Sequence, residues 1–261
     1  MMVRWRFTEA EFYVLWMDKA GMEPPEPFMF TSLTRTPEDL RIELREARAS
    51  LNEKMDGDFH AAFDAMANPD MYLSAYGWND QDPWGVDSQI RVRATRKGPR
   101  GYLITQLPGA TYWRRGGYTV SECDPIELSN VVIDAMPSAE RGSRGDMALT
   151  APDQDLDYDH GRSVVSGPLD TAVNKTEKFL QEAALAAGEI YVVQGRSVFG
   201  PRGATRHLVR FRDLADDGRY VITENPAYVR AVDRTRFVSV LNSHVALVIA
   251  AIKDERGSAR T

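Results

Sequence analysis

The feature that most constrains the fold of this 261-residue chain is a pattern of three strands that occurs twice. Runs rich in Tyr, Leu, Val and Ile predict strands over residues 71–77, 90–95 and 102–107 in the first half, and over 189–194, 208–212 and 220–223 in the second. Met71-Tyr72-Leu73 corresponds to Ile190-Tyr191-Val192, and Gly101-Tyr102-Leu103 corresponds to Arg219-Tyr220-Val221. Strand sequences are degenerate enough to match by chance, but the shared order favours an internal duplication.

Helix signals precede the first three strands. The segment Thr8-Glu9-Ala10-Glu11 fits a capping box that starts a helix, and Gly21 should end that helix. A second helix is predicted to begin after Thr36 as its cap, with proline in its first turn. A third, short helix is predicted around residues 59–66.

Two further helices are predicted in the second half. The first covers residues 168–187, and Gly188 should end it. The last carries a wide apolar stripe from Phe237 to Ile252. We interpret most of that stripe as intramolecular core, with a part left for a partner. Its longest apolar run, Val245 to Ile252, is far shorter than the roughly 20 residues that cross a bilayer, so no membrane insertion is expected.

A polar segment separates the two halves. Residues 141–167 are rich in Gly and Asp, which predicts a long, mobile connection. The best metal candidates lie within it, at Asp153, Asp155, Asp157, Asp159 and His160. A calcium-binding loop that starts at Asp153 would place Tyr158 where glycine is needed and Val164 where a glutamate is needed. This mismatch disfavours calcium.

Composition excludes several classes of protein. The net charge of −6 argues against a phosphate-binding surface, so nucleic acid is not an expected partner. Cys123 is the single cysteine, which rules out an internal disulfide. The N-terminal segment carries Glu9 and Glu11 where a signal peptide would be apolar. We therefore expect a cytoplasmic protein.

No catalytic constellation is found in the sequence. The segments around Ser163 and Ser197 lack the closing glycine of a nucleophile elbow, and the four histidines form no helical pair that would bind a metal. Cys123 lies beside Asp124 with no basic neighbour, which is typical of an unreactive thiol. We therefore expect no enzyme activity, no cofactor and no metal.

Three segments resemble the EspG family of type VII (ESX) secretion-associated proteins of actinobacteria. They are the opening Phe7-Thr8-x-x-Glu11-Phe12-x-x-Leu15-Trp16, the segment Gly188-Glu189-Ile190-Tyr191-Val192-Val193, and Phe211-Arg212-Asp213 leading to Asp217-Gly218-Arg219-Tyr220. The resemblance implies an α+β fold with pseudo-twofold halves, in which helical bundles flank a central antiparallel sheet. A single domain would then comprise halves at about residues 1–140 and 166–261, joined by about 141–165.

The resemblance also implies a function. Members of the family act as cytosolic chaperones of PE-PPE heterodimers: they bind the apolar helical tip of the PPE subunit and keep the pair soluble until secretion. No cofactor or nucleotide is implied. Whether the free chain is a monomer or a homodimer stays open. The residues expected to bind the partner are Trp78, Trp84, Val86, Tyr191, Val193, Phe199, Arg210 and Arg212.

Several alternatives stay open at this stage. Trp78 and Trp84 fit both a partner surface and the core, because tryptophan is enriched in both. Arg91 and Arg93, like Arg210 and Arg212, alternate with apolar residues, which fits a solvated strand face or a rim that pairs with acidic partner residues. A small-molecule binding protein or enzyme that uses a pocket between the halves is the second functional hypothesis, and a purely structural subunit is a third.

Overall fold

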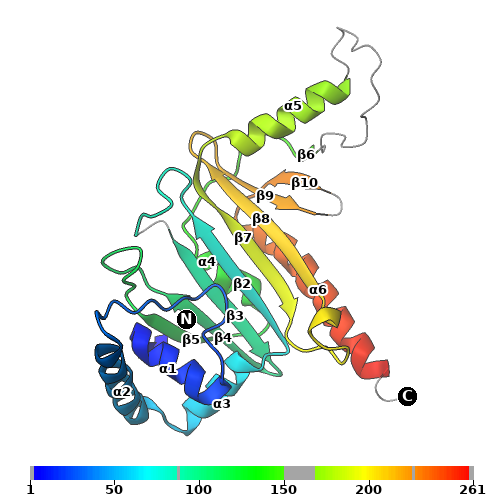
Figure 1. Ribbon diagram of the computed structural model, residues 1–261. Coiled ribbons are helices and arrows are strands. Elements are labelled where there is room, and N and C mark those ends of the chain that lie inside the picture. The colour runs from blue at the N-terminus through cyan, green and yellow to red at the C-terminus, as the bar shows by residue number, and fades with distance from the viewer. Residues whose placement is uncertain (1–2, 87–88, 150–167, 225–226, 259–261) are drawn as a thin grey trace, which may run out of the picture.

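A ten-stranded antiparallel sheet forms the centre of the computed structural model, which describes residues 3–86, 89–149, 168–224 and 227–258 (Figure 1). Its strands are β1 (Val3–Phe7), β2 (Met71–Trp78), β3 (Ile90–Lys97), β4 (Arg100–Gln106), β5 (Tyr118–Cys123), β6 (Met147–Ala148), β7 (Ala184–Gln194), β8 (Arg206–Leu214), β9 (Arg219–Thr223) and β10 (Tyr228–Ala231). The helices are α1 (Glu9–Ala20), α2 (Pro37–Lys54), α3 (Gly57–Ala67), α4 (Leu128–Asp134), α5 (Pro168–Gln181) and α6 (Arg234–Ser258), with a 3-10 turn at Pro201–Gly203. The predicted α+β class is confirmed.

The order of the strands has a twofold pattern. Along the sheet it runs β1-β5-β4-β3-β2-β7-β8-β9-β10-β6. Outward from the β2–β7 pair, the order β2-β3-β4-β5-β1 on one side therefore corresponds to β7-β8-β9-β10-β6 on the other. The three strands predicted in each half are all present, at β2, β3 and β4 and at β7, β8 and β9. The duplication of the sequence itself stays a prediction.

One face of the sheet is covered by α4 and α6. Leu73, Val92, Ile190 and Val209 point to this face and are buried with the apolar residues of those two helices. The register alternates side chains between the faces, so every second residue of these strands enters this core. In Figure 1, α6 runs behind β7 and β8.

Among the described residues, the opposite face carries helices only towards the two ends of the sheet. Helices α1, α2 and α3 bury their apolar residues against Tyr102, Ile104, Tyr118 and Val120 of β4 and β5. At the other end, Phe179 of α5 packs edge-on against Tyr220, with ring centroids 5.3 Å apart. The sheet is therefore flanked by helices on both faces, but those on this second face leave its middle open.

The predicted helix starts are confirmed in atomic detail. Thr8 accepts a hydrogen bond from the Glu11 amide, and the Glu11 carboxylate accepts one from the Thr8 amide, which completes the capping box. Thr36 caps α2 and Gly21 ends α1 in the left-handed conformation. Glu11 is buried, and it also accepts hydrogen bonds from Ser50 and Lys54 of α2. This network ties α1 to α2.

The helix predicted over residues 168–187 was wrong at its C-terminal end. Helix α5 ends at Gln181 and β7 already begins at Ala184, so Gly188 lies inside a strand. The alanine-rich segment has a high helix propensity, but pairing with β2 and β8 outweighs that preference. Gly188 faces Gly77 on β2, and a Cβ at Gly188 would lie 2.2 Å from the Tyr76 carbonyl oxygen.

The connection between the halves was also partly misjudged. Residues 147–148 form β6, which pairs with β10, and Arg141 makes a bridge to Arg219. This part of the predicted mobile segment is therefore held on the edge of the sheet. The rest of it, including Asp153 to Asp159, lies outside the described residues. Strands β1, β5 and β10 and helix α4 were not predicted, because they are short and lack a clear period.

By length and composition alone, α6 would suit a bilayer, since its most apolar window has a mean hydropathy of 1.6. A single helix of this kind is equally typical of a core helix in a globular protein. One face of α6 is buried on the sheet through Phe237, Leu241 and Val248. Its opposite face exposes Leu247.

Replacement of Gly188 by alanine should destabilise the sheet at its centre. The added methyl group would overlap the backbone of β2 and the ring of Phe211, and overpacking of this kind costs about 1–3 kcal/mol. Urea unfolding of Gly188→Ala measures the loss. Gly145→Ala is the control, because no atom lies within 4 Å of a Cβ at that position. Equal stability of the two variants would contradict the close approach of β2 and β7.

The Glu11 network should make stability depend on acid pH. Burial opposes ionisation of Glu11, but the hydrogen bonds from Lys54, Ser50 and the Thr8 amide outweigh it and lower the pKa of Glu11. A carboxyl with a lowered pKa stabilises the fold above its unfolded pKa, and that contribution is lost as the pH falls through the folded pKa. Glu11→Gln should therefore reduce the free energy of unfolding by about 1.5–3 kcal/mol at pH 7.

The difference between Glu11→Gln and the wild type should shrink as the pH is lowered from 5 to 3, as followed by thermal unfolding at each pH. Glu38→Gln serves as the control, since Glu38 forms an exposed ion pair with Arg41 on the surface of α2. A gap that stayed constant over this range would show that the charge of Glu11 does not stabilise the fold.

Candidate partner-binding surface

The open middle of the second sheet face is the candidate functional surface. We call it the central strip, and it comprises the side chains that β2, β7 and β8 direct to this face: Tyr72, Ser74, Tyr76, Trp78, Ala187, Glu189, Tyr191, Val193, Arg206, Leu208, Arg210 and Arg212. In Figure 1 no helix crosses in front of the middle of these strands. Four of the predicted partner-binding residues lie on this strip with side chains that are at least partly exposed: Trp78, Tyr191, Arg210 and Arg212.

The centre of the strip is polar and internally paired. Arg210 forms ion pairs with Glu189 at 3.2 Å and with Glu224 at 2.5 Å. The Tyr191 hydroxyl donates a 2.6 Å hydrogen bond to Glu189, which raises the pKa of Tyr191, and the Arg206 guanidinium lies 3.9 Å from the centroid of the Tyr191 ring. Because these charges pair with one another, the centre of the strip is polar, and the orientations of its hydrogen-bonding groups are fixed.

At one end of the strip, Trp78 is held by its neighbours. Its indole nitrogen donates a 2.8 Å hydrogen bond to Asp80, and Arg212 bonds both Asp80 and the carbonyl of Glu182. Trp78 is half-buried and packs against the core cluster around Phe179. The core interpretation therefore applies to one part of the Trp78 side chain, which packs on this cluster, and the surface interpretation applies to the rest, which is open to solvent.

Trp84 is on the outside of the molecule. Its side chain is 63% exposed and forms an edge-to-face contact with Tyr112 at 4.7 Å. Trp113, which is 48% exposed, completes an aromatic cluster that joins the β2–β3 loop to the β4–β5 loop. The sequence analysis missed Tyr112 and Trp113, although an adjacent Tyr-Trp pair in a glycine-rich loop is itself a sign of surface aromatics.

A groove lies between the central strip and the aromatic cluster. Its volume is about 420 Å³, and the segment from Glu26 to Met29 forms its far wall. Tyr76, Arg91, Tyr112 and Tyr191 are among the side chains that line it. The backbone of the wall is fixed to the sheet, since the Glu26 carbonyl accepts hydrogen bonds from Ser74 and Arg93. This groove was not anticipated from the sequence.

The structure corrects the solvated interpretation of Arg91 and Arg93. Their exposed fractions are 4% and 7%, so neither guanidinium lies on a solvated face. Arg93 stacks on Tyr72 at 3.6 Å, and its burial lowers its pKa. The alternation that predicted a strand face was right, but the segment Glu26 to Met29 comes from far away in the sequence and covers that face.

The remaining predicted residues lie elsewhere. Val193 is 7% exposed, so the free chain does not present it. Phe199 is 74% exposed, beside Val198 at 63%, in the β7–β8 loop where Ser197 donates a hydrogen bond to Glu255 of α6. Val86 lines a separate cavity.

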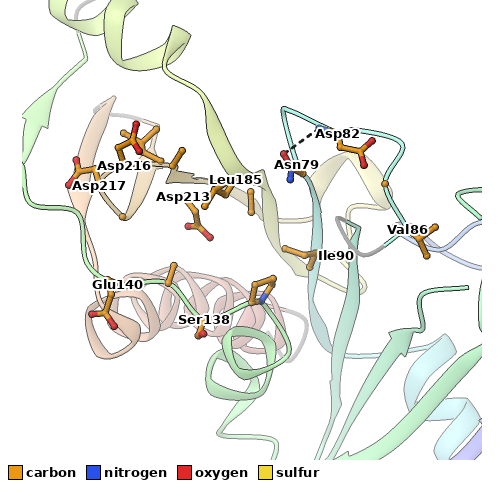
Figure 2. Close-up of a pocket in the computed structure, with 17 residues that line it drawn as sticks. Asn79, Asp82, Val86, Ile90, Ser138, Glu140, Leu185, Asp213, Asp216 and Asp217 are labelled. Atoms are coloured by element: carbon orange, nitrogen blue, oxygen red, sulfur yellow. Dashed lines mark hydrogen bonds between the residues drawn. The ribbon is translucent and has the colours of Figure 1, made fainter.

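That cavity has a volume of about 750 Å³ and receives residues from both halves of the chain (Figure 2). Val86, Ile90 and Leu185 form its apolar part, and carboxylates surround them. Two of these carboxylates are already engaged: Asp213 forms a two-pronged ion pair with Arg219, and Asp217 accepts hydrogen bonds from Ser143 and Tyr220.

The described residues contain no group of three or more His, Cys, Asp or Glu side chains that would hold a metal ion. The Cys123 thiol, predicted to be unreactive, has a pKa raised to about 12 by burial, with Asp124 and Glu122 adding to the shift. His207 and His244 face each other with ring centroids 5.1 Å apart, and burial lowers the pKa of His244.

A protein-family model described as the EspG family matches residues 8–242. The chain belongs to the EspG family. The resemblance drawn from the three sequence segments is thereby confirmed. A comparison with curated proteins gave no match.

Among solved structures, the chain is similar to the Mycobacterium tuberculosis type VII secretion system chaperone EspG5, determined in complex with a PE25-PPE41 dimer. The sequence identity is 11% and the TM-score is 0.48; the match covers 80% of this chain and 84% of that one.

Trp84→Ala should leave the stability of the free chain nearly unchanged. An exposed side chain contributes little to the core, so the free energy of unfolding should change by no more than about 0.5 kcal/mol. Trp16→Ala is the contrasting variant, because Trp16 is fully buried and its removal should cost about 3–5 kcal/mol. Thermal unfolding compares them. A large loss in Trp84→Ala would show that this tryptophan belongs to the core.

Proposed function

We propose that this chain is a cytoplasmic, non-enzymatic chaperone that binds a PE-PPE heterodimer through the apolar helical tip of its PPE subunit. It would keep the pair soluble and deliver it to a type VII secretion system. Membership of the EspG family supports the proposal. The observation that carries it is the central strip, an open stretch of sheet bordered by the exposed aromatic cluster of Trp84, Tyr112 and Trp113.

The strip and the cluster suit an apolar helical tip. A helical tip that exposes apolar side chains needs a surface that removes them from water, and aromatic side chains provide large contact areas at low conformational cost. Trp84 and Trp113 offer such areas, while Glu189 and Arg210 offer charged groups beside them. Interfaces with aromatic anchors and a polar rim combine affinity with selectivity.

Phe199 is exposed beyond the other end of the strip, in a loop that is hydrogen-bonded to α6. It lies in the β7–β8 loop, whereas Trp84 lies in the β2–β3 loop at the opposite end of the same strands. A partner that contacted both loops would lie along β7 and bury Tyr191. We assign the predicted residues Trp78, Trp84, Tyr191, Phe199, Arg210 and Arg212 to this surface, and give Val193 a supporting role beneath it.

A second candidate function is supported by the cavity between the halves. A volume of about 750 Å³ with an apolar part and several carboxylates is the size of a small-molecule site. Asp213 and Asp217 are, however, held in ion pairs and hydrogen bonds within the chain. A cationic small molecule would have to compete with these partners, which favours the chaperone.

Co-expression with PE-PPE pairs from the same genome tests the chaperone. One pair should become soluble and elute with the chain as a heterotrimer in size-exclusion chromatography. Trp84→Ala should weaken that complex by about 30-fold or more, since truncation of an aromatic anchor costs at least about 2 kcal/mol. The complexes are co-purified, and their dissociation on dilution is compared by size-exclusion chromatography.

Leu247→Ala is the matched control. Leu247 is 53% exposed and lies on α6, which covers the opposite face of the sheet. The loss of an exposed apolar side chain there should not change the affinity. If every PE-PPE pair stayed insoluble or eluted apart from the chain, the proposed function would be wrong, and ligand screening at the cavity between the halves would follow.

A further inference from the structure

Arg91 is a buried cation that has no carboxylate partner within the described residues. It sits on β3 at the wall of the groove, and only 4% of it is exposed. Its three hydrogen bonds go to the Pro27 carbonyl, to Gln89 and to the Tyr112 hydroxyl, all at 3.3–3.4 Å. Its Nε atom is buried and makes no hydrogen bond. A guanidinium in this state is poorly compensated for its loss of water.

Arg219 is a buried arginine with a structural role, and it provides a comparison within the same chain. Its guanidinium is 3% exposed, and it donates two hydrogen bonds of 2.6 Å to the two oxygens of Asp213. This two-pronged arrangement uses the planar fork of the side chain and neutralises its charge. Arg91 is similarly buried, but its terminal nitrogens bond only neutral oxygens and its Nε makes no hydrogen bond. Within the described residues, the difference between the two arginines is therefore that Arg91 lacks a carboxylate partner.

A second guanidinium, that of Arg115, interacts electrostatically with Arg91. Burial and the charge of Arg91 both lower the pKa of Arg115, whose guanidinium lies 4.4 Å from the centroid of the Tyr112 ring. The nearest groove carboxylate across the sheet, Glu189, is engaged by Arg210 and Tyr191. Glu9 accepts a hydrogen bond from the backbone of Arg115. Two carboxylates line the groove, Glu26 and Glu189, but neither forms a hydrogen bond or ion pair with the Arg91 guanidinium.

The groove also has the shape and lining for one inserted side chain. Tyr76 and Tyr112 lie on either side of Arg91, with their ring centroids 5.3 and 5.8 Å from its guanidinium carbon. Tyr76 stands directly between Arg91 on β3 and Glu189 on β7 in the register of the sheet. A carboxylate that entered beside Tyr112 would meet Arg91 in surroundings with little water, where a charge-assisted pair is strong.

We propose that the groove at Arg91 is a subsite for one carboxylate, the side chain of an Asp or Glu on the bound partner. This proposal rests on the proposed function and makes it more specific. It adds to the chaperone surface a site that recognises one acidic residue of the partner beside the apolar contacts. The carboxylate takes the Nε–H of Arg91, which is buried and without a hydrogen bond in the free chain, and one terminal N–H. Binding thereby compensates a charge that the free chain leaves without an anion.

A double-mutant cycle on the complex with the co-eluting PE-PPE pair tests this subsite. Arg91→Met should weaken the complex at least about 30-fold, because removal of one member of a buried charge pair leaves the other unpaired. One Asp→Asn or Glu→Gln substitution in the PPE tip should cause a similar loss, and should cause almost no further loss when combined with Arg91→Met. Independent, additive losses for every acidic residue of the tip would overturn the proposal.

Two control variants separate binding from folding. Arg91→Met should leave the thermal unfolding midpoint of the free chain unchanged or higher, because it removes an uncompensated buried charge. Arg219→Met should lower that midpoint, since it leaves Asp213 buried and unpaired. A midpoint that fell as far in Arg91→Met as in Arg219→Met would assign Arg91 to structure and overturn the proposal.

A measurement on the free chain keeps the subsite testable apart from the chaperone function. N-acetyl-aspartate N-methylamide is titrated into ¹⁵N-labelled protein, and the Nε–H signal of Arg91, assigned by its absence in Arg91→Lys, is followed by NMR. The signal should shift with this probe and stay unchanged with the asparagine analogue. If the Arg91 Nε–H signal shifted but no PE-PPE pair formed a complex with the chain in co-expression, the carboxylate subsite would be retained and the chaperone function rejected. Equal responses to the two probes would reject the subsite.

Discussion

The close pairing of β2 with β7 is the contact on which the rest of the structure depends. Eight residue pairs, from Met71 with Gln194 to Trp78 with Ala187, join the two halves into one sheet. Near the end of this pairing Gly77 lies opposite Gly188, and the ring of Phe211 occupies the space that two Cβ atoms would need. Phe211 is fully buried and reaches Phe237 of α6. The two glycines thus allow the aromatic core of one face to form across the junction.

This junction explains which parts of the fold the sequence predicted. Strands with a clear pattern, such as the alternating β3 and the apolar run of β9, carry their signals locally, as do helices with clear caps, such as α1 and α2. Residues 184–188 carry the opposite local signal, because alanines favour a helix. Their strand conformation depends on β2 and β8, which are distant in the sequence. The short strands β5 and β6 likewise depend on pairing with other strands: β5 pairs with β1 and β4, and β6 pairs with β10.

The candidate surface divides in the same way. Trp84 and Phe199 are exposed aromatics in loops. The sequence left Trp84 open between a partner surface and the core, because tryptophan is enriched in both. Val193 was placed on the right strand and face, yet it is buried. The state of Arg91 could not be inferred, because its burial comes from the segment Glu26 to Met29, which lies more than sixty residues earlier in the chain. Alternation predicts the face of a strand, but it does not predict what covers that face.

The distribution of helices gives the surface its character. Helices α4 and α6 cover one face of the sheet around the β2–β7 junction, which fixes the central strands from behind. Because α1 to α3 and α5 pack near opposite ends of the other face, that face stays open where the sheet is best supported. A binding surface on paired strands has less conformational entropy to lose than one on loops alone. The buried, unpaired Arg91 fits this arrangement, since a rigid sheet can hold a charge in a position that is unfavourable until an anion arrives.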